Sequence, residues 1–234
     1  MSALGEKIFF GVPCMDHKID VDCAISVFKK LQEYGGHQYF LKGISDIAYA
    51  RNLLAHKFKK TDCDWFLMID SDISFSDEDW ELLWEGDEDI VVCAYARKMP
   101  GMPPADIGLG LARIHRRVFE MIENLENESG AEMAQRFYLN GEIHTHFFPN
   151  GVTGDSRWLG EDKGFLTLCS MTGAKVRWEN RTRLRHRGSF YYGYPDQDCG
   201  AKFWSPNVQI ERCEACGENP HALECPTLKP IVVM

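Results

Sequence analysis

Two aspartates that follow an apolar segment are the residues best placed to do chemistry in this 234-residue chain. Asp70 and Asp72 come directly after residues 64–69, an apolar run that predicts a buried strand. Two carboxylates at positions i and i+2 can hold one hard divalent cation together, and open α/β sheets bind ligands at the carboxyl ends of their strands. A metal-bound diphosphate would suit this pair, but the segment Asp-Ser-Asp could equally form an Asx-type turn into the next helix.

A histidine in an arginine-rich segment is a second candidate for metal binding. Residues 181–187 have the sequence Arg-Thr-Arg-Leu-Arg-His-Arg, and side chains alternate between two faces in an extended strand. The four arginines then share one face, and His186 shares the other with Thr182 and Leu184. A neutral imidazole there could complete a site of two aspartates and one histidine. The arginines could bind the phosphates of one substrate, a second substrate that is anionic, or only solvent and neighbouring acids.

The cysteines indicate a separate site near the end of the sequence. Cys213, Cys216, His221 and Cys225 have the spacing C-x2-C-x4-H-x3-C, which could place three thiolates and an imidazole around a structural zinc ion. The alternative is a tail whose thiols bind no metal. Of the six other cysteines, five stand singly in apolar surroundings, where we expect small buried side chains: Cys14, Cys23, Cys63, Cys93 and Cys169.

Alternating strand and helix patterns predict the elements that position these residues. Strands are expected at residues 7–12, 37–41, 64–69 and 90–95 with helices between them, which is typical of a mostly parallel sheet covered by helices. Three helices are predicted in this part of the chain. The first is capped by Asp20 or Asp22 and has Ala24, Phe28 and Leu31 on one face, the second is capped by Ser45 with Arg51-Asn52 on its flank, and the third covers residues 77–84.

The second half of the chain has a mixed pattern. The segment 99–104 is rich in proline and predicts a connector, and helices are expected near residues 116–126 and 163–171. Asn140-Gly141 predicts a hairpin turn, and His144 and His146 beyond it could be structural or could face an acceptor. The expected fold class is therefore α/β, with a mostly parallel central sheet flanked by helices, a mixed α+β half and a cysteine-rich tail.

The order of several motifs resembles the GT-A glycosyltransferases over about residues 7–192. The motifs are Pro13 after the first strand, Ala50-Arg51-Asn52, residues 65–72 with Ile73 and Phe75, residues 89–92, Gly108-x-Gly110 with residues 116–119, Gly160-Glu161-Asp162, and residues 185–188. In that family the Asp-x-Asp motif binds a divalent metal, usually manganese, that holds the donor diphosphate. The resemblance implies a Rossmann-like GT-A fold with a nucleotide-sugar half at residues 1–98 and an acceptor half at 99–200. The tail at 201–234 lies outside the family pattern.

The same resemblance implies roles for individual residues. Asp72 and His186 would bind Mn²⁺ or Mg²⁺ with Asp70 beside them, because a cation stabilises the charge that develops on departing phosphates. Asp162, at a helix start that favours an ionised carboxylate, would take the proton of the acceptor hydroxyl, with Glu161 as the alternate base and inversion favoured. Contacts to a UDP- or GDP-linked sugar would come from Pro13, Arg51, Asp70, Ser71 and Lys98.

Composition narrows the partners and the location. The formal net charge of -9 disfavours a general nucleic-acid coating protein, and the first residues contain no long apolar segment. With the cysteines as thiols or metal ligands, a reducing cytosol is expected, either bacterial or in a virus-infected host. The acceptor would be a glycan or another glycoconjugate, or a modified base in DNA, and the oligomeric state stays open.

Two other classes of function remain alternatives. A nucleotidyltransferase also uses an α/β sheet and carboxylate-bound metal. It would usually show a glycine-rich, lysine-containing phosphate loop near its first strand, and Gly11-Val-Pro-Cys14 is not such a loop. A non-enzymatic binding module would instead recognise a partner through the zinc site of the tail.

Overall fold

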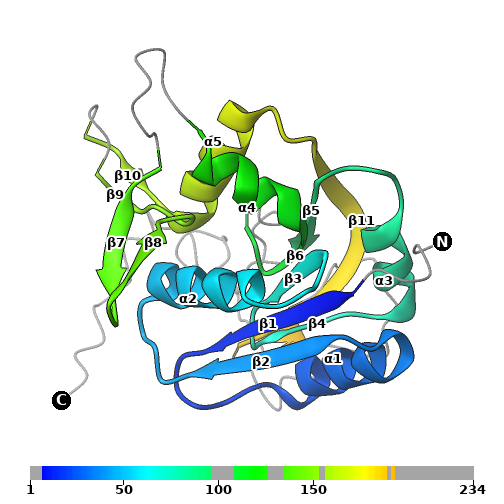
Figure 1. The fold of residues 1–234 in the computed structure, drawn as a ribbon. Coiled ribbons are helices and arrows are strands. Elements are labelled where there is room, and N and C mark those ends of the chain that lie inside the picture. Colours follow the sequence, from blue (N-terminus) through cyan, green and yellow to red (C-terminus); the bar gives the residue numbers. More distant parts are fainter. Residues whose placement is uncertain (1–6, 96–107, 126–133, 153–155, 189–190, 193–234) are drawn as a thin grey trace, which may run out of the picture. The chain divides into compact units, whose positions relative to one another are not determined.

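A computed structural model describes residues 7–95, 108–125, 134–152, 156–188 and 191–192. It contains an eight-stranded sheet with the strand order β12-β11-β5-β6-β3-β1-β2, in which β4 pairs with β11 off this path (Figure 1). The strands of this sheet are β1 (Ile8–Cys14), β2 (His37–Lys42), β3 (Trp65–Ile69), β4 (Ile73–Ser74), β5 (Ile90–Tyr95), β6 (Leu111–His115), β11 (Val176–Arg187) and β12 (Tyr191–Tyr192).

Most of the long strands of this sheet run in the same direction. β1 is parallel to both β2 and β3, and the first part of β11 is parallel to β5. β6 lies between β3 and β5 and is antiparallel to both, so β3 and β5 point the same way. The carboxyl ends of β1, β3 and β5 therefore share one edge of the sheet. This arrangement confirms the predicted mostly parallel sheet.

Helices cover both faces of the sheet, because its buried strands are apolar on both sides. In β1, Phe9 belongs to the core cluster shared with α2, α4 and α5, whereas Phe10 belongs to the cluster shared with α1 and α3. In β3, Phe66 and Leu67 divide in the same way, as the two-residue period of a strand requires. The helices are α1 (Val21–Tyr34), α2 (Ile47–Lys59), α3 (Asp77–Trp84), α4 (Arg116–Glu123) and α5 (Glu161–Thr172). Within the described ranges, none of them combines the length and the hydropathy that a membrane span requires.

Local sequence signals set several helix ends as predicted. Asp20 caps α1 with its side chain, and Ser76 and Asp79 form the reciprocal capping box that starts α3. Gly173 ends α5 in the left-handed conformation, with φ of 77°. Only glycine adopts this conformation at little cost, which explains why the helix ends at this residue.

Two small hairpins form separate sheets. β7 (Arg136–Leu139) and β8 (Glu142–Thr145) are antiparallel, and Asn140 and Gly141 between them have φ angles of 50° and 87°. Two successive residues with positive φ form a tight hairpin turn, so this prediction is confirmed. β9 (Gly151–Val152) pairs with β10 (Trp158–Leu159), which is followed closely by α5.

The buried side of α1 differs from the prediction. Val27 and Lys30 are buried, whereas Phe28 is 47% exposed. The ring of Phe28 packs against Phe40 on the edge strand β2, with 5.8 Å between the ring centroids. This contact at the rim of the sheet holds Phe28 without placing it over the sheet. Of the three residues expected on one face, Ala24 and Leu31 are half-buried and only Phe28 is exposed.

α2 also differs from the prediction, both at its start and on its buried side. Asp46, rather than Ser45, caps the helix, because its carboxylate accepts a hydrogen bond from the Tyr49 N–H at 3.0 Å. Arg51 and Asn52, expected on the flank, are only 2% and 1% exposed. A prediction that buries only apolar residues fails here, since both polar side chains have partners inside the protein.

Candidate functional site

The turn after β3 places Asp70 and Asp72 at the carboxyl edge of the sheet. The Asp70 N–H donates to the Gly110 carbonyl at 2.8 Å, and the Ile73 N–H donates back to the Asp70 carbonyl at 3.0 Å. A tight backbone turn from Asp70 to Ile73 therefore follows β3. It is closed by backbone groups, so both carboxylates can face other partners.

A buried arginine joins the first of these carboxylates to two others. The Arg51 side chain, on α2, is 2% exposed, and its Nη2 donates to Asp70 Oδ1 at 3.0 Å. Its Nη1 donates to Glu161 Oε1 at 2.9 Å and also contacts the Asp162 carboxylate. Glu161 and Asp162 form the first turn of α5, so packing of α5 near α2 brings them to the end of β3. We call these four residues the Arg51 cluster.

Burial controls protonation within the Arg51 cluster. Loss of water raises the pKa of Asp162 to about 6, Arg51 opposes this shift, and the charges of Glu161 and Asp70 add to it. Burial by itself would lower the pKa of Arg51, but the three carboxylates reverse the effect, so the pKa is raised and the guanidinium stays charged. One cation among three acids leaves an excess of negative charge that a further cation would offset.

A histidine from β11 lies beside Asp72. The antiparallel pairing of β11 with β4 sets His186 opposite Ile73, and the Arg187 N–H donates to the Asp72 carbonyl at 2.7 Å. His186 Nε2 is 3.5 Å from Asp72 Oδ1, and the two side chains are 12% and 31% exposed. Asp70 turns to Arg51 instead, so the described residues present Asp72 and His186 as a pair.

Tyr95, at the end of β5, packs against His186 and was not identified from the sequence. Its ring is perpendicular to that of His186, with 5.2 Å between the centroids. A Cβ at Gly108 would lie 2.3 Å from Tyr95 Oη, and a Cβ at Gly110 would lie 2.6 Å from Ile73 Cδ1. The Gly-x-Gly motif therefore makes room for these side chains. Burial raises the pKa of Tyr95, so its phenol stays protonated and available as a hydrogen-bond donor.

The other predicted site residues lie in varied places. Pro13 is buried within β1, and Ser71 is half-buried in the turn after β3. Arg51 was expected at the donor, and the structure places it beneath the carboxylates. Outside the described residues lie Lys98 and the predicted zinc set of Cys213, Cys216, His221 and Cys225.

β11 shows the predicted alternation in its second half. Thr182 and Leu184 are buried and His186 is half-buried, whereas the arginines at positions 181, 183, 185 and 187 are exposed. The inward direction of His186, away from the arginines, is what allows it to meet Asp72.

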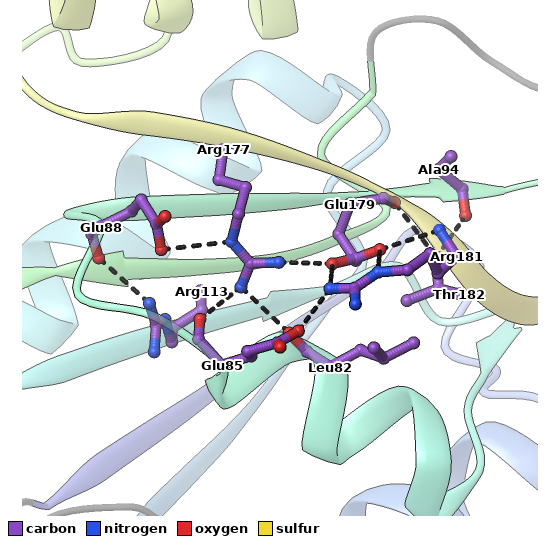
Figure 2. Close-up of polar contacts among 9 residues, drawn as sticks. All are labelled: Leu82, Glu85, Glu88, Ala94, Arg113, Arg177, Glu179, Arg181 and Thr182. Atoms are coloured by element: carbon purple, nitrogen blue, oxygen red, sulfur yellow. Dashed lines mark hydrogen bonds and ion pairs between the residues drawn. The ribbon is translucent and has the colours of Figure 1, made fainter.

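The first half of β11 carries a polar cluster that the sequence analysis missed (Figure 2). The Glu179 side chain is 2% exposed and accepts hydrogen bonds from Arg177 and Arg181. Arg177 also donates to Glu88 at 3.2 Å and to the Leu82 carbonyl at 3.0 Å. The hydrogen bonds from Arg181 lower the pKa of Glu179 more than burial raises it. The available signal was the i, i+2 spacing of these residues, which can bring side chains together along a strand. We call Arg177, Glu179 and Arg181 the Glu179 cluster.

The two histidines of the β7–β8 hairpin take part in internal contacts. The ring of His144 lies 4.3 Å from that of His56 on α2, and His146 lies 6.1 Å from Phe137. His56 Nε2 is 2.9 Å from the Thr145 carbonyl, and burial lowers the pKa of His56 to about 4. These contacts favour the structural role among the two that the sequence left open.

Comparisons with known proteins find similarity in fold alone. No family model matches the chain, and no curated protein matches it. A197 from STIV is 15% identical with a TM-score of 0.47, and the match covers 78% of this chain and 86% of that one. The catalytic domain of Drosophila beta1,4-galactosyltransferase 7, in complex with xylobiose, is 15% identical with a TM-score of 0.46, over 75% of this chain and 66% of that one.

Another similar structure is named for nucleotidyl transfer rather than for sugar transfer. The inositol-1-phosphate CTP transferase from T. maritima is 10% identical with a TM-score of 0.42, over 78% of this chain and 89% of that one. The similar structures thus include both a glycosyltransferase and a nucleotidyltransferase. At these TM-scores the likenesses assign no activity to this chain, which has to be inferred from its own site.

Proposed function

We propose that this protein is a metal-dependent glycosyltransferase that moves a sugar from a nucleotide-sugar donor to an acceptor hydroxyl. The observation that carries the proposal is the meeting of two kinds of group at one edge of the sheet. Asp72 and His186 form a pair suited to a cation, with 3.5 Å between their nearest polar side-chain atoms, and Asp162 nearby has a pKa raised to about 6. Such perturbed groups at the carboxyl ends of strands are typical of functional sites.

The residues of the pair fit a divalent metal ion. Asp72 offers a carboxylate oxygen and His186 an imidazole nitrogen, and this combination favours a transition-metal ion such as Mn²⁺ over Mg²⁺, which keeps to oxygen ligands. Asp70 lies two residues from Asp72, and the excess negative charge of the Arg51 cluster attracts a cation to the same edge. The bound ion would supply positive charge to the leaving diphosphate.

Asp162 fits the role of the base. A carboxylate with a pKa of about 6 is ionised at neutral pH and is more basic than an ordinary aspartate, which suits removal of a proton from an acceptor hydroxyl. Arg51 orients this carboxylate, and Glu161 beside it is the alternate base. A single base of this kind favours a reaction that inverts the anomeric centre.

For the donor and the acceptor we propose classes of compound and not single compounds. Ser71 and Lys98 would contact the nucleotide sugar. The buried Pro13 and Arg51 would act on it only through their neighbours, Arg51 through Asp70. The nucleotide would be UDP or GDP. The acceptor would be a glycan or another glycoconjugate, or a modified base in DNA.

The first experiment is a thermal-unfolding screen of nucleotide sugars with Mn²⁺. A donor at about one hundred times its Kd should raise the unfolding temperature by roughly 5–10 °C. Asp72→Asn should abolish the shift, and the matched control Asp87→Asn should keep it, because Asp87 is exposed and pairs with Lys175. A shift that persists in Asp72→Asn or in EDTA would contradict the proposed metal site. A response to nucleoside triphosphates alone would instead favour a nucleotidyltransferase.

A second experiment tests the base. Asp162→Asn should lower the rate of sugar transfer by roughly 10²–10⁴-fold while the donor-induced thermal shift remains. Glu161→Gln is the matched variant, since it removes the neighbouring charge from the same helix turn. If Glu161→Gln loses transfer and Asp162→Asn does not, the two roles are reversed.

A further inference from the structure

A second group of potential metal ligands lies at the opposite edge of the sheet from the proposed active site. His37 is the first residue of β2, and Asp62 and Cys63 stand in the loop before β3, so all three lie at the amino ends of parallel strands. We propose that His37, Asp62 and Cys63 bind a zinc-like divalent cation. This site is separate from the Asp72–His186 pair and from the cysteines of the tail.

The geometry of the three side chains fits a single ion. One imidazole nitrogen, one carboxylate oxygen and one sulfur all lie within 4.8 Å of one another. His37 Nε2 is 3.6 Å from Asp62 Oδ1. Zinc bond lengths and tetrahedral angles require ligand atoms about 3.3–3.8 Å apart, so the nitrogen and oxygen already match and the sulfur needs to move by about 1 Å at most.

The loop that carries two of the ligands is held firmly. Arg116 Nε donates to the Cys63 carbonyl at 2.7 Å, and its Nη2 donates to the carbonyls of Thr61 at 2.8 Å and Phe58 at 3.2 Å. One guanidinium thus ties the end of α2 to the loop before β3. A preorganised loop reduces the entropy that ligand ordering would cost.

The environment suits an open site with a borderline-soft metal. Cys63 is fully buried, whereas the side chains of His37 and Asp62 are 56% and 63% exposed. An ion among them would have protein on the sulfur side and water on the other, and a water molecule would complete four ligands. Mixed nitrogen, oxygen and sulfur ligands favour Zn²⁺ over Mg²⁺ or Ca²⁺.

Lys7 occupies the place of a cation in the metal-free arrangement. Its ammonium contacts Asp62, and the two side chains are 55% and 63% exposed. An exposed ion pair of this kind is weak and can be displaced. On metal binding the Cys63 thiol releases its proton to solvent and its sulfur binds the ion. The Lys7 side chain then swings out into the solvent. The net charge of the site stays at zero, because the divalent ion balances the Asp62 carboxylate and the Cys63 thiolate.

Cobalt titration of the full-length chain tests the site, because Co²⁺ bound to a thiolate gives a near-ultraviolet charge-transfer band. The host carries Cys199→Ser, Cys213→Ser, Cys216→Ser and Cys225→Ser, so that thiols outside the described residues cannot contribute. The Asp72–His186 pair contains no sulfur and gives no such band, so failure of the proposed transferase activity does not affect the readout. We expect one equivalent of Co²⁺ to produce the band and Zn²⁺ to remove it.

Variants of the three ligands and of Lys7 sharpen the test. Cys63→Ser and His37→Ala should each weaken metal binding by more than about 100-fold. Loss of a residue that only supports a metal ligand costs at most about 100-fold, so a larger loss indicates direct binding. Cys169→Ser, which changes a buried cysteine on α5, should leave binding unchanged. Lys7→Met should tighten binding roughly twofold to fivefold, whereas Lys29→Met, at a similarly exposed pair with Asp77, should not.

Two results would overturn the proposal. One is the absence of the band in the host protein, and the other is an unchanged band in His37→Ala. The His37 side chain is 56% exposed, so its removal should leave the fold intact even if Cys63→Ser unfolds the protein. Far-ultraviolet circular dichroism of each variant checks this point.

Discussion

The Arg51 cluster and the Glu179 cluster are both ion-pair networks around one buried charged side chain, but that side chain has opposite charge in the two. In the Arg51 cluster one guanidinium faces Asp70, Glu161 and Asp162, and burial raises the pKa of Asp162 to about 6. In the Glu179 cluster two guanidiniums face one carboxylate, and the pKa of that carboxylate is lowered. The first arrangement leaves negative charge in excess, whereas the second neutralises its buried acid.

Under the proposed function, this difference distinguishes charges that serve ligand binding from charges that stabilise the fold. The Nε–H of Arg51 is buried and has no hydrogen-bond partner among the described residues, so this cluster is not fully satisfied by the protein. Glu179, by contrast, accepts bonds from both neighbouring arginines, and Arg177 further binds Glu88 and backbone carbonyls. The Arg51 donor requires an acceptor such as a water molecule, whereas the excess of carboxylates in the same cluster would be offset by a cation. The Glu179 carboxylate is already matched by two arginines.

The largest effect is expected when the single cation of the Arg51 cluster is removed. Arg51→Met should lower the free energy of unfolding at pH 7.5 by about 3–5 kcal/mol, because it leaves three carboxylates close together without compensation. Urea denaturation measures this loss. Arg51→Lys keeps the charge and should lose less.

The pH dependence of Arg51→Met provides its control. Arg51 lowers the pKa of Asp162, so the variant should raise that pKa above about 6. At pH 5 Asp162 is then protonated, and the deficit in unfolding free energy should shrink. A variant as stable as the parent at pH 7.5 would show that Arg51 does not hold the cluster together.

The next effect concerns Asp162, whose raised pKa implies a cost to stability. A carboxyl with a folded pKa of about 6 and an ordinary value of 3.8 favours the folded state when protonated, below about pH 4, and this benefit is lost as the pH rises through 6. Asp162→Asn should therefore be more stable than the parent by up to about 3 kcal/mol at pH 7.5, and equal to it near pH 4. Urea denaturation across this pH range is the measurement, and equal stability at all pH values would contradict the raised pKa.

Much of the fold could be predicted because its signals are local. Apolar runs ending in polar turns located β1, β3 and β5, and the capping box of Ser76 and Asp79 located α3. The buried side of α1 could not be predicted, because Phe28 finds its partner Phe40 on the edge strand, and sequence periodicity contains no information about such a contact.

The site was predictable only in part, for a related reason. Asp70, Asp72, Glu161, Asp162 and His186 each stood at a recognisable place in the sequence. Asp70 is joined to Glu161 and Asp162 by Arg51, however, which the sequence placed on the flank of its helix. A buried charged residue needs charged or polar partners, and two partners of Arg51, the carboxylates of α5, are more than one hundred positions away in the sequence. His37, Asp62 and Cys63 were missed because their proximity comes from the parallel pairing of β1 with β2 and β3.

Glu179→Gln tests the structural side of the comparison. The side chain is 2% exposed and bonded to two arginines, so loss of its charge should lower the free energy of unfolding by about 2 kcal/mol at pH 7. Because the folded pKa of Glu179 is lowered, this contribution exists above its ordinary value of 4.5 and disappears as the pH falls through the folded pKa. The pH trend is thus opposite to that of Asp162. Donor-induced thermal shifts should be unchanged, and a loss of donor binding would contradict the division between the clusters.

The smallest effect is expected at the exposed end of the Glu179 cluster. The Arg181 side chain is 54% exposed, whereas that of Arg177 is 19% exposed, although both contact the same carboxylate. Water screens the Arg181 contact, so Arg181→Met should lower the urea midpoint by less than half as much as Glu179→Gln, and high salt should reduce the difference further. Arg177→Met, which also loses bonds to Glu88 and to backbone carbonyls, should cost more and depend less on salt. If Arg181→Met destabilised the protein more than Arg177→Met, the exposed arginine would be the main partner of Glu179. Burial of Arg177 would then not explain the difference between the two clusters.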